Sequence, residues 1–153
     1  MIREAAAEIE APERLRRRLP PPPSRWPLAL RALGALGALA VGAVHLQQYV
    51  KLYSAVPTIG TLFVLNFAGA TVIGLALLAP IERLAAPLAA GGIVLAATSF
   101  AFLLVSEHRP LFGFQEPGYD PAGIAAARIS EIAAVVLLGG FLVASRRQHR
   151  RSS

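Results

Sequence analysis

The sequence predicts an all-α fold, a bundle of four transmembrane helices with both termini in the cytoplasm. Hydrophobic residues make up 55% of the 153 residues and charged residues only 16%, a composition nearer to membrane proteins than to soluble domains. Four apolar segments are each long enough to cross a bilayer as a helix. Arginine gathers in both terminal segments, so an even number of spans should begin and end on the cytoplasmic side.

The predicted order is a polar tail, one membrane domain and a basic tail. Residues 1–27 form an Arg/Pro-rich cytoplasmic tail that contains a run of four prolines. Part of Ile2 to Leu19 can form an amphipathic surface helix, but a solvated tail is favoured. Residues 145–153 form a basic cytoplasmic tail. Between the tails, residues 28–144 hold the spans, at about 28–47, 57–79, 87–105 and 122–144.

The first span carries a stripe of small residues. Gly34, Ala38 and Gly42 recur every four residues, so another helix can approach this face closely, and His45 lies on the same face. Arg31 lies near the basic end of the span, where we expect its side chain to snorkel to the lipid headgroups.

The second span, 57–79, has no charged residue, and its one strongly polar side chain is Asn66. We expect this amide to form a hydrogen bond with a neighbouring helix. The segment IERLAA (81–86) predicts a short turn before the third span, which carries a second stripe of small residues: Gly92, Ala96, Ser99 and Ser106.

A loop rich in proline and glycine precedes the fourth span and bears polar side chains, among them His108, Glu116 and Asp120. With both tails inside, this loop and the connection containing Lys51 lie on the outer side of a multi-pass protein of the plasma membrane, the bacterial inner membrane.

Polar residues of the second and fourth spans fall at one depth. Asn66 and Glu131 each lie about nine residues, or roughly 13 Å, inside the outer end of their span, and His45 should lie one to two turns above them. Arg128 is three residues before Glu131, a spacing that allows an ion pair, either structural or functional. The candidate ligand pocket therefore contains His45, Tyr49, Asn66, Glu116, Arg128 and Glu131.

Several functions remain open for these residues. The pocket can stabilise the bundle, hold a lipid or quinone headgroup, relay protons, or perform acid–base catalysis on a lipid-borne substrate. Alternatively, His45 and His108 can bind a haem, or a metal with nearby carboxylates. The chain contains no GxSxG, HExxH or GxGxxG motif, and its lack of cysteine excludes thiolate sites.

Four short motifs suggest a family. They are HLxxY from His45, PTIGTLFxLN from Pro57, LFGFQEPGY from Leu111 and AxxxSE ending at Glu131. In these motifs the chain resembles uncharacterised four-helix integral membrane proteins of high-GC bacteria. In size and helix number it also resembles the DoxX-like membrane proteins at the level of the fold. The resemblance implies the same four-helix topology and the same polar positions, with no assigned activity.

We therefore expect a small, non-enzymatic accessory or interaction component whose outer pocket holds a lipid-like ligand, with a haem-binding or quinone-linked redox protein as the alternative. Its partner is the lipid bilayer, together with other membrane proteins or a second copy of the chain. The net charge of +6 comes from arginines beside the spans, which favours anionic lipid over nucleic acid.

Overall fold

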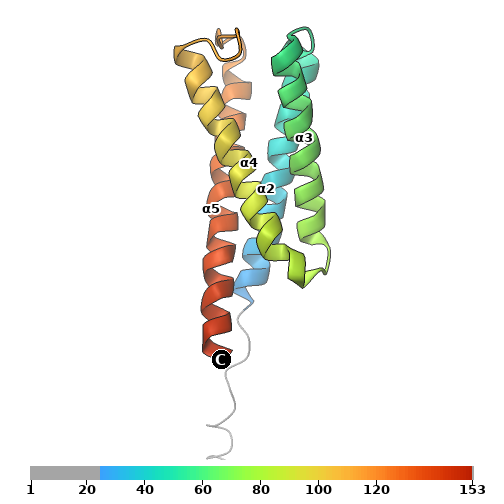
Figure 1. Cartoon of the computed structure of the whole chain (residues 1–153), viewed down its shortest axis with the longest axis vertical. Coiled ribbons are helices and arrows are strands. Elements are labelled where there is room, and N and C mark those ends of the chain that lie inside the picture. Colours follow the sequence, from blue (N-terminus) through green and yellow to red (C-terminus); the bar gives the residue numbers. More distant parts are fainter. Residues whose placement is uncertain (1–24, 153) are drawn as a thin grey trace, which may run out of the picture.

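The computed structural model describes residues 25–152, which form four long helices and no strand. Helix α2 (Trp26–Gln48) continues into the π-helical turn η1 (Tyr49–Tyr53), and is followed by α3 (Pro57–Leu78), α4 (Glu82–His108) and α5 (Pro121–Ser152) (Figure 1). All four helices are long and apolar enough to cross a membrane. The predicted class, an all-α four-helix transmembrane bundle, is confirmed. The two alternatives for residues 2–19, a solvated tail and a surface helix, lie outside the described residues.

Three helices are longer than the apolar segments that predict them, the first because η1 extends α2 to Tyr53. The predicted turn at 81–86 is wrong, because α4 begins at Glu82 and contains Pro87. Pro87 is the sixth residue of α4 and removes one backbone hydrogen bond inside the helix, a loss that transmembrane helices tolerate. Helix α5 continues from the fourth span through Ser152, across the predicted basic tail, since the segment after Ala144 contains no proline or glycine.

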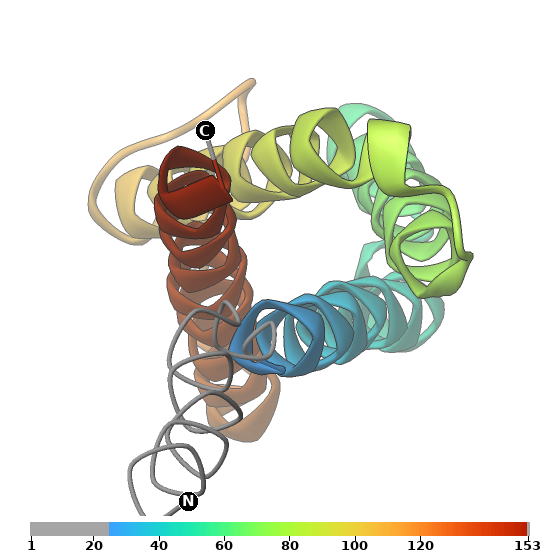
Figure 2. The ribbon, with the colours of Figure 1, turned by 90° about the horizontal axis from the view of Figure 1, so that it is seen from below.

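The helices form a ring in which α2 lies between α3 and α5, and α4 closes the ring (Figure 2). Small residues allow this close packing. A Cβ at Gly34 would lie 2.5 Å from a methyl carbon of Leu138 on α5. A Cβ at Gly42 would lie 3.1 Å from Thr71 Oγ1 and 3.2 Å from the Phe67 carbonyl oxygen, both on α3. The predicted stripe of the first span is therefore a packing face, shared between α5 and α3.

Arg31 is held by the turn between α3 and α4. The expectation that it snorkels is wrong, because its side chain is buried and its guanidinium donates hydrogen bonds to Glu82 Oε1 at 2.8 Å and to the Ala79 carbonyl oxygen at 3.1 Å. The turn brings two acceptors beside α2, so the arginine charge is satisfied within the protein.

The opposite end of the bundle is closed by residues 109–120, which we call the α4–α5 loop (top of Figure 1). Leu111 and Phe114 exchange backbone hydrogen bonds of 2.7 and 3.0 Å around a tight turn. Both central residues of the turn, Phe112 and Gly113, have positive φ angles of 52° and 80°, as in a type I′ turn. We call this end of the bundle the loop end.

Candidate ligand-binding cavity

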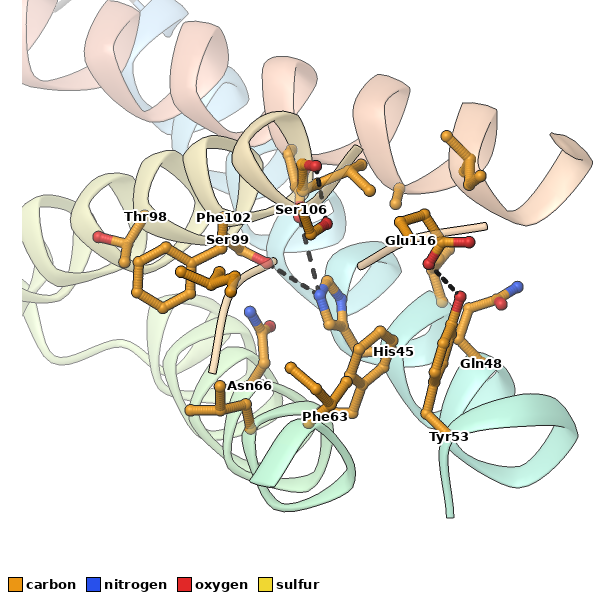
Figure 3. Close-up of a pocket in the computed structure, with 18 of the residues that line it drawn as sticks. His45, Gln48, Tyr53, Phe63, Asn66, Thr98, Ser99, Phe102, Ser106 and Glu116 are labelled. Carbon is orange, nitrogen blue, oxygen red and sulfur yellow. Dashed lines mark hydrogen bonds and ion pairs between the residues drawn. The ribbon is translucent and has the colours of Figure 1, made fainter. Parts of the chain in front are cut away.

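A cavity of about 240 Å³ lies among all four helices near the loop end (Figure 3). Its volume suffices for about eight water-sized groups, so it can hold a polar headgroup and a few carbons of a longer molecule. Its walls are mostly apolar or aromatic, and its polar side chains come from every helix and from the α4–α5 loop: His45, Gln48, Tyr53, Asn66, Thr98, Ser99, Ser106, Glu116 and Glu131.

His45 stands at the centre of the polar wall. Its Nδ1 lies 2.9 Å from the Val41 carbonyl oxygen and its Nε2 lies 2.9 Å from Ser99 Oγ (Figure 3). Because a carbonyl oxygen only accepts, Nδ1 carries a hydrogen and donates to Val41, and Nε2 is hydrogen-bonded to the Ser99 hydroxyl. Glu131 Oε1 lies 3.7 Å from the same Nε2. The three side chains form one cluster drawn from α2, α4 and α5.

His45 therefore lies in the layer of Glu131, not one to two turns above it. The sequence-based depth assumed that the first helix ends near Gln47. In the structure η1 continues the helix to Tyr53, so His45 lies eight residues from the helix end, about 12 Å deep.

Two buried polar atoms in the cavity wall have no hydrogen-bond partner: Asn66 Oδ1 and Glu131 Oε2. The Asn66 side chain is 8% exposed and that of Glu131 is 1% exposed. The expected hydrogen bond from Asn66 to a neighbouring helix does not form. An unpaired buried acceptor costs about 1–3 kcal/mol. Both side chains line the cavity, so a ligand that donates hydrogen bonds there could satisfy them.

The opening of the cavity faces sideways. Of the residues that line it, those with exposed side chains are Leu65 on α3, with Thr98 and Phe102 on α4. These positions lie inside the apolar spans, where the bilayer surrounds the protein. Figure 1 shows α3 and α4 diverging toward the loop end. The accessible route into the cavity therefore passes between α3 and α4 from the lipid.

The α4–α5 loop covers the cavity at the loop end. Leu111, Phe114 and Glu116 line the cavity from this loop. Tyr53 donates a hydrogen bond to Glu116 Oε2, and the Gly118 backbone N–H donates to Glu116 Oε1 at 2.9 Å. Both carboxylate oxygens of Glu116 are thus occupied, and the loop is fixed to η1.

A second link fixes the start of α5. Asp120 Oδ1 accepts a hydrogen bond from the Gly123 backbone N–H at 3.1 Å, and Oδ2 accepts one from Gln48 Nε2 at 2.8 Å. The bond from Gln48 contributes most to lowering the pKa of Asp120, and the Gly123 N–H lowers it further. The ionised carboxylate therefore caps α5 and joins it to α2.

Arg128 does not join the cluster. Its guanidinium contacts both carboxylate oxygens of Glu107 on α4, and Arg128 does not line the cavity. The ion pair with Glu131 that the spacing allowed is absent. A helix turns about 100° per residue, so side chains three positions apart point about 60° apart. Glu131 consequently faces the bundle interior while Arg128 faces α4.

The two other predicted positions also lie outside the cavity. Tyr49 does not line the cavity, although one of its ring carbons lies 3.3 Å from where a Cβ of Gly60 would be. His108 is exposed, and its Nδ1 lies 2.8 Å from the Leu104 carbonyl oxygen. His45, Asn66, Glu116 and Glu131 are the predicted residues that the structure brings together.

His45 and His108 share no site in this arrangement. Both ring nitrogens of His45 are hydrogen-bonded, and His108 is outside the cavity. Among residues 25–152, no group of three or more His, Cys, Asp or Glu side chains could hold a metal ion. Haem binding by the two histidines remains a prediction that the geometry does not support.

Sequence reasoning missed Ser99 and Tyr53. Ser99 was predicted only as a packing residue, although it lies nine residues from the end of α4, at the depth of Asn66 and Glu131. This shared depth is a signal that could have found it. No comparable signal exists for Tyr53, which reaches the cavity because η1 extends α2 by a π-helical turn.

Comparisons with family models, with curated proteins and with solved structures found no match to this chain. The resemblance to four-helix membrane proteins of high-GC bacteria therefore stays a prediction. Functional inference depends on the cavity itself.

Proposed function

We propose that this protein is a non-enzymatic membrane component that binds one lipid-like amphiphile in the cavity near its loop end. The proposal depends on one observation: Asn66 Oδ1 and Glu131 Oε2, two buried polar atoms without a partner among the described residues, belong to side chains that line a cavity whose exposed wall lies within the membrane spans. A ligand that enters from the bilayer can satisfy both atoms while its apolar chain stays in lipid.

The arrangement of the walls supports this binding mode. Leu65, Thr98 and Phe102 flank the opening where the chain of the ligand would pass. The polar cluster around His45 lies at the inner end of that path, about 12 Å from the loop end. A pocket with apolar walls and a few convergent polar groups is typical of small-molecule sites.

Binding is favoured over catalysis by the position of Ser99. A hydroxyl 2.9 Å from an imidazole nitrogen is the pair used in nucleophilic catalysis. Acyl transfer also needs hydrogen-bond donors for the developing oxyanion. Ser99 lies in the middle of α4, where the backbone N–H groups are used by the helix itself, so the backbone around it supplies no such donor.

The test is native mass spectrometry of the protein extracted from its host membrane in mild detergent. Ala127 lines the cavity, whereas Ala125, two residues earlier on α5, is exposed and lies outside it. We expect the wild-type protein and Ala125→Phe to carry an additional bound mass of a few hundred daltons. We expect Ala127→Phe to lose it, because the phenyl ring fills the cavity.

Comparing Ala127→Phe with Ala125→Phe distinguishes a ligand bound in the cavity from lipid that adheres to the outer surface of the protein. Equal retention of the bound mass by both phenylalanine variants, or its absence from the wild-type protein, would show that the cavity does not hold a lipid-like ligand in the cell.

We also propose that the loop end faces the outside of a bacterial plasma membrane, which places the cavity in the outer leaflet. The support is the concentration of arginine in both termini. Since the chain has no native cysteine, Gln115→Cys and Ser152→Cys can each be labelled alone. A membrane-impermeant maleimide should label Gln115→Cys on intact cells and Ser152→Cys only after lysis. The reverse pattern would invert the topology.

A further inference from the structure

We propose that the ligand carries a cationic amine, and that Glu131 is its counter-ion. This inference rests on the proposed binding function and names the class of molecule: an amphiphile with an ammonium headgroup and an apolar chain.

The described residues that line the cavity include two carboxyl groups, Glu116 and Glu131, and no lysine or arginine. The nearest basic side chains identified in the structure have their own partners. Arg128 is paired with Glu107, and Lys51 Nζ lies 3.9 Å from Asp120 Oδ2. An anionic headgroup would therefore meet like charge without a compensating cation, which is unfavourable in a low-dielectric site.

Glu131 is the carboxyl group with a free oxygen. Both oxygens of Glu116 accept hydrogen bonds, whereas Glu131 Oε2 accepts none. His45 uses both ring nitrogens, for Val41 and Ser99, and its Nε2 lies 3.7 Å from Glu131 Oε1, too far for a direct hydrogen bond. A carboxylate that is 1% exposed inside a membrane span must hold a proton or meet a cation.

An ammonium group matches the free acceptors. It donates up to three hydrogen bonds and accepts none. Glu131 Oε2 and Asn66 Oδ1 are two acceptors in the same cavity that need a donor. A hydroxyl headgroup could donate to one of them only. A charge-assisted hydrogen bond to the Glu131 carboxylate would be about twice as strong as a neutral one.

Aromatic rings from α3, η1 and the α4–α5 loop form part of the cavity wall. Phe63 packs against His45 and Tyr53, with ring centroids 5.1 and 4.7 Å apart, and Phe114 meets Tyr53 edge-on at 5.6 Å. The faces of phenyl and phenol rings attract cations, more strongly in a desolvated site. These rings favour an ammonium group over a neutral headgroup of the same size.

The test compares three probes that differ only in headgroup: tetradecylamine, tetradecanol and tetradecanoate. The full-length protein is kept in an uncharged maltoside detergent at neutral pH, and its melting temperature is measured by circular dichroism. A molecule that binds the native state raises this temperature. We expect the largest shift with the amine, a smaller one with the alcohol and the smallest with the carboxylate.

The variant Glu131→Gln keeps the size of the side chain and removes its charge. We expect it to weaken amine binding by about tenfold or more, which corresponds to about 1.4 kcal/mol, while the shift with the alcohol is unchanged. Glu82→Gln, at the opposite end of the bundle, is the matched control and should respond to the amine as the wild-type protein does.

The outcomes separate the two proposals. If the alcohol or the carboxylate equals the amine, or if Glu131→Gln keeps the full response to the amine, the cationic assignment is wrong while the binding function stands. If no probe shifts the wild-type protein and Ala127→Phe loses no bound mass, the binding function itself fails. The comparison of probes on the wild-type protein decides the assignment even if Glu131→Gln does not fold.

Discussion

Arg128→Met is expected to lower the free energy of unfolding by about 1–3 kcal/mol, because it removes the cation that holds Glu107. Breaking a fully buried ion pair costs about 3–5 kcal/mol. The Arg128 side chain is 40% exposed and that of Glu107 is 20% exposed, so screening reduces the expected cost. The measurement is unfolding in mixed micelles of rising dodecyl sulfate content, followed by circular dichroism.

A double-mutant comparison identifies the partner of Arg128. Adding Glu107→Gln to Arg128→Met removes the unpaired carboxylate and should recover much of the loss, whereas adding Glu131→Gln should give an additive effect. Recovery by Glu131→Gln instead would mean that Arg128 pairs along its own helix, as the spacing of three residues allows. The two glutamine variants make the same chemical change, so each serves as the control for the other.

The four helices could be predicted because a membrane-spanning helix forms all of its backbone hydrogen bonds within itself. A long apolar segment is therefore sufficient evidence for such a helix. The helix bounds could not be read in the same way. Hydropathy marks the part of a helix that contacts lipid, and α4 begins five residues before its apolar part, at Glu82. The extension of α2 by η1 is likewise invisible to hydropathy, although it sets the depth of His45.

The cavity could be predicted in part, because depth along a helix follows from sequence while rotation and packing do not. Matching depths brought Asn66 and Glu131 together correctly. The same reasoning misplaced Arg128, since the direction in which a side chain leaves α5 depends on how α5 packs against α4. The lateral opening at Leu65 and Phe102 depends on the divergence of α3 and α4, which no local pattern encodes.

Asn66→Leu is expected to stabilise the ligand-free protein by about 1–3 kcal/mol and to abolish the bound mass. Asn66 is buried, and its Oδ1 has no partner among the described residues. Burial therefore removes the hydrogen bonds of this oxygen to water, and no hydrogen bond within the bundle replaces them. Leucine has a similar size and no polar group to desolvate. Unfolding in mixed micelles gives the change in stability, and native mass spectrometry gives the loss of ligand.

Gln48→Leu is the matched control. Gln48 also lines the cavity and is equally buried, but its amide donates to Asp120 at 2.8 Å, so its removal should destabilise the protein by about 0.5–1.5 kcal/mol or more. Opposite signs for two buried amides in one cavity would distinguish a binding group from a structural one. If Asn66→Leu also destabilises the protein, Asn66 is part of the packing of the bundle, and the observation that carries the proposed function is lost.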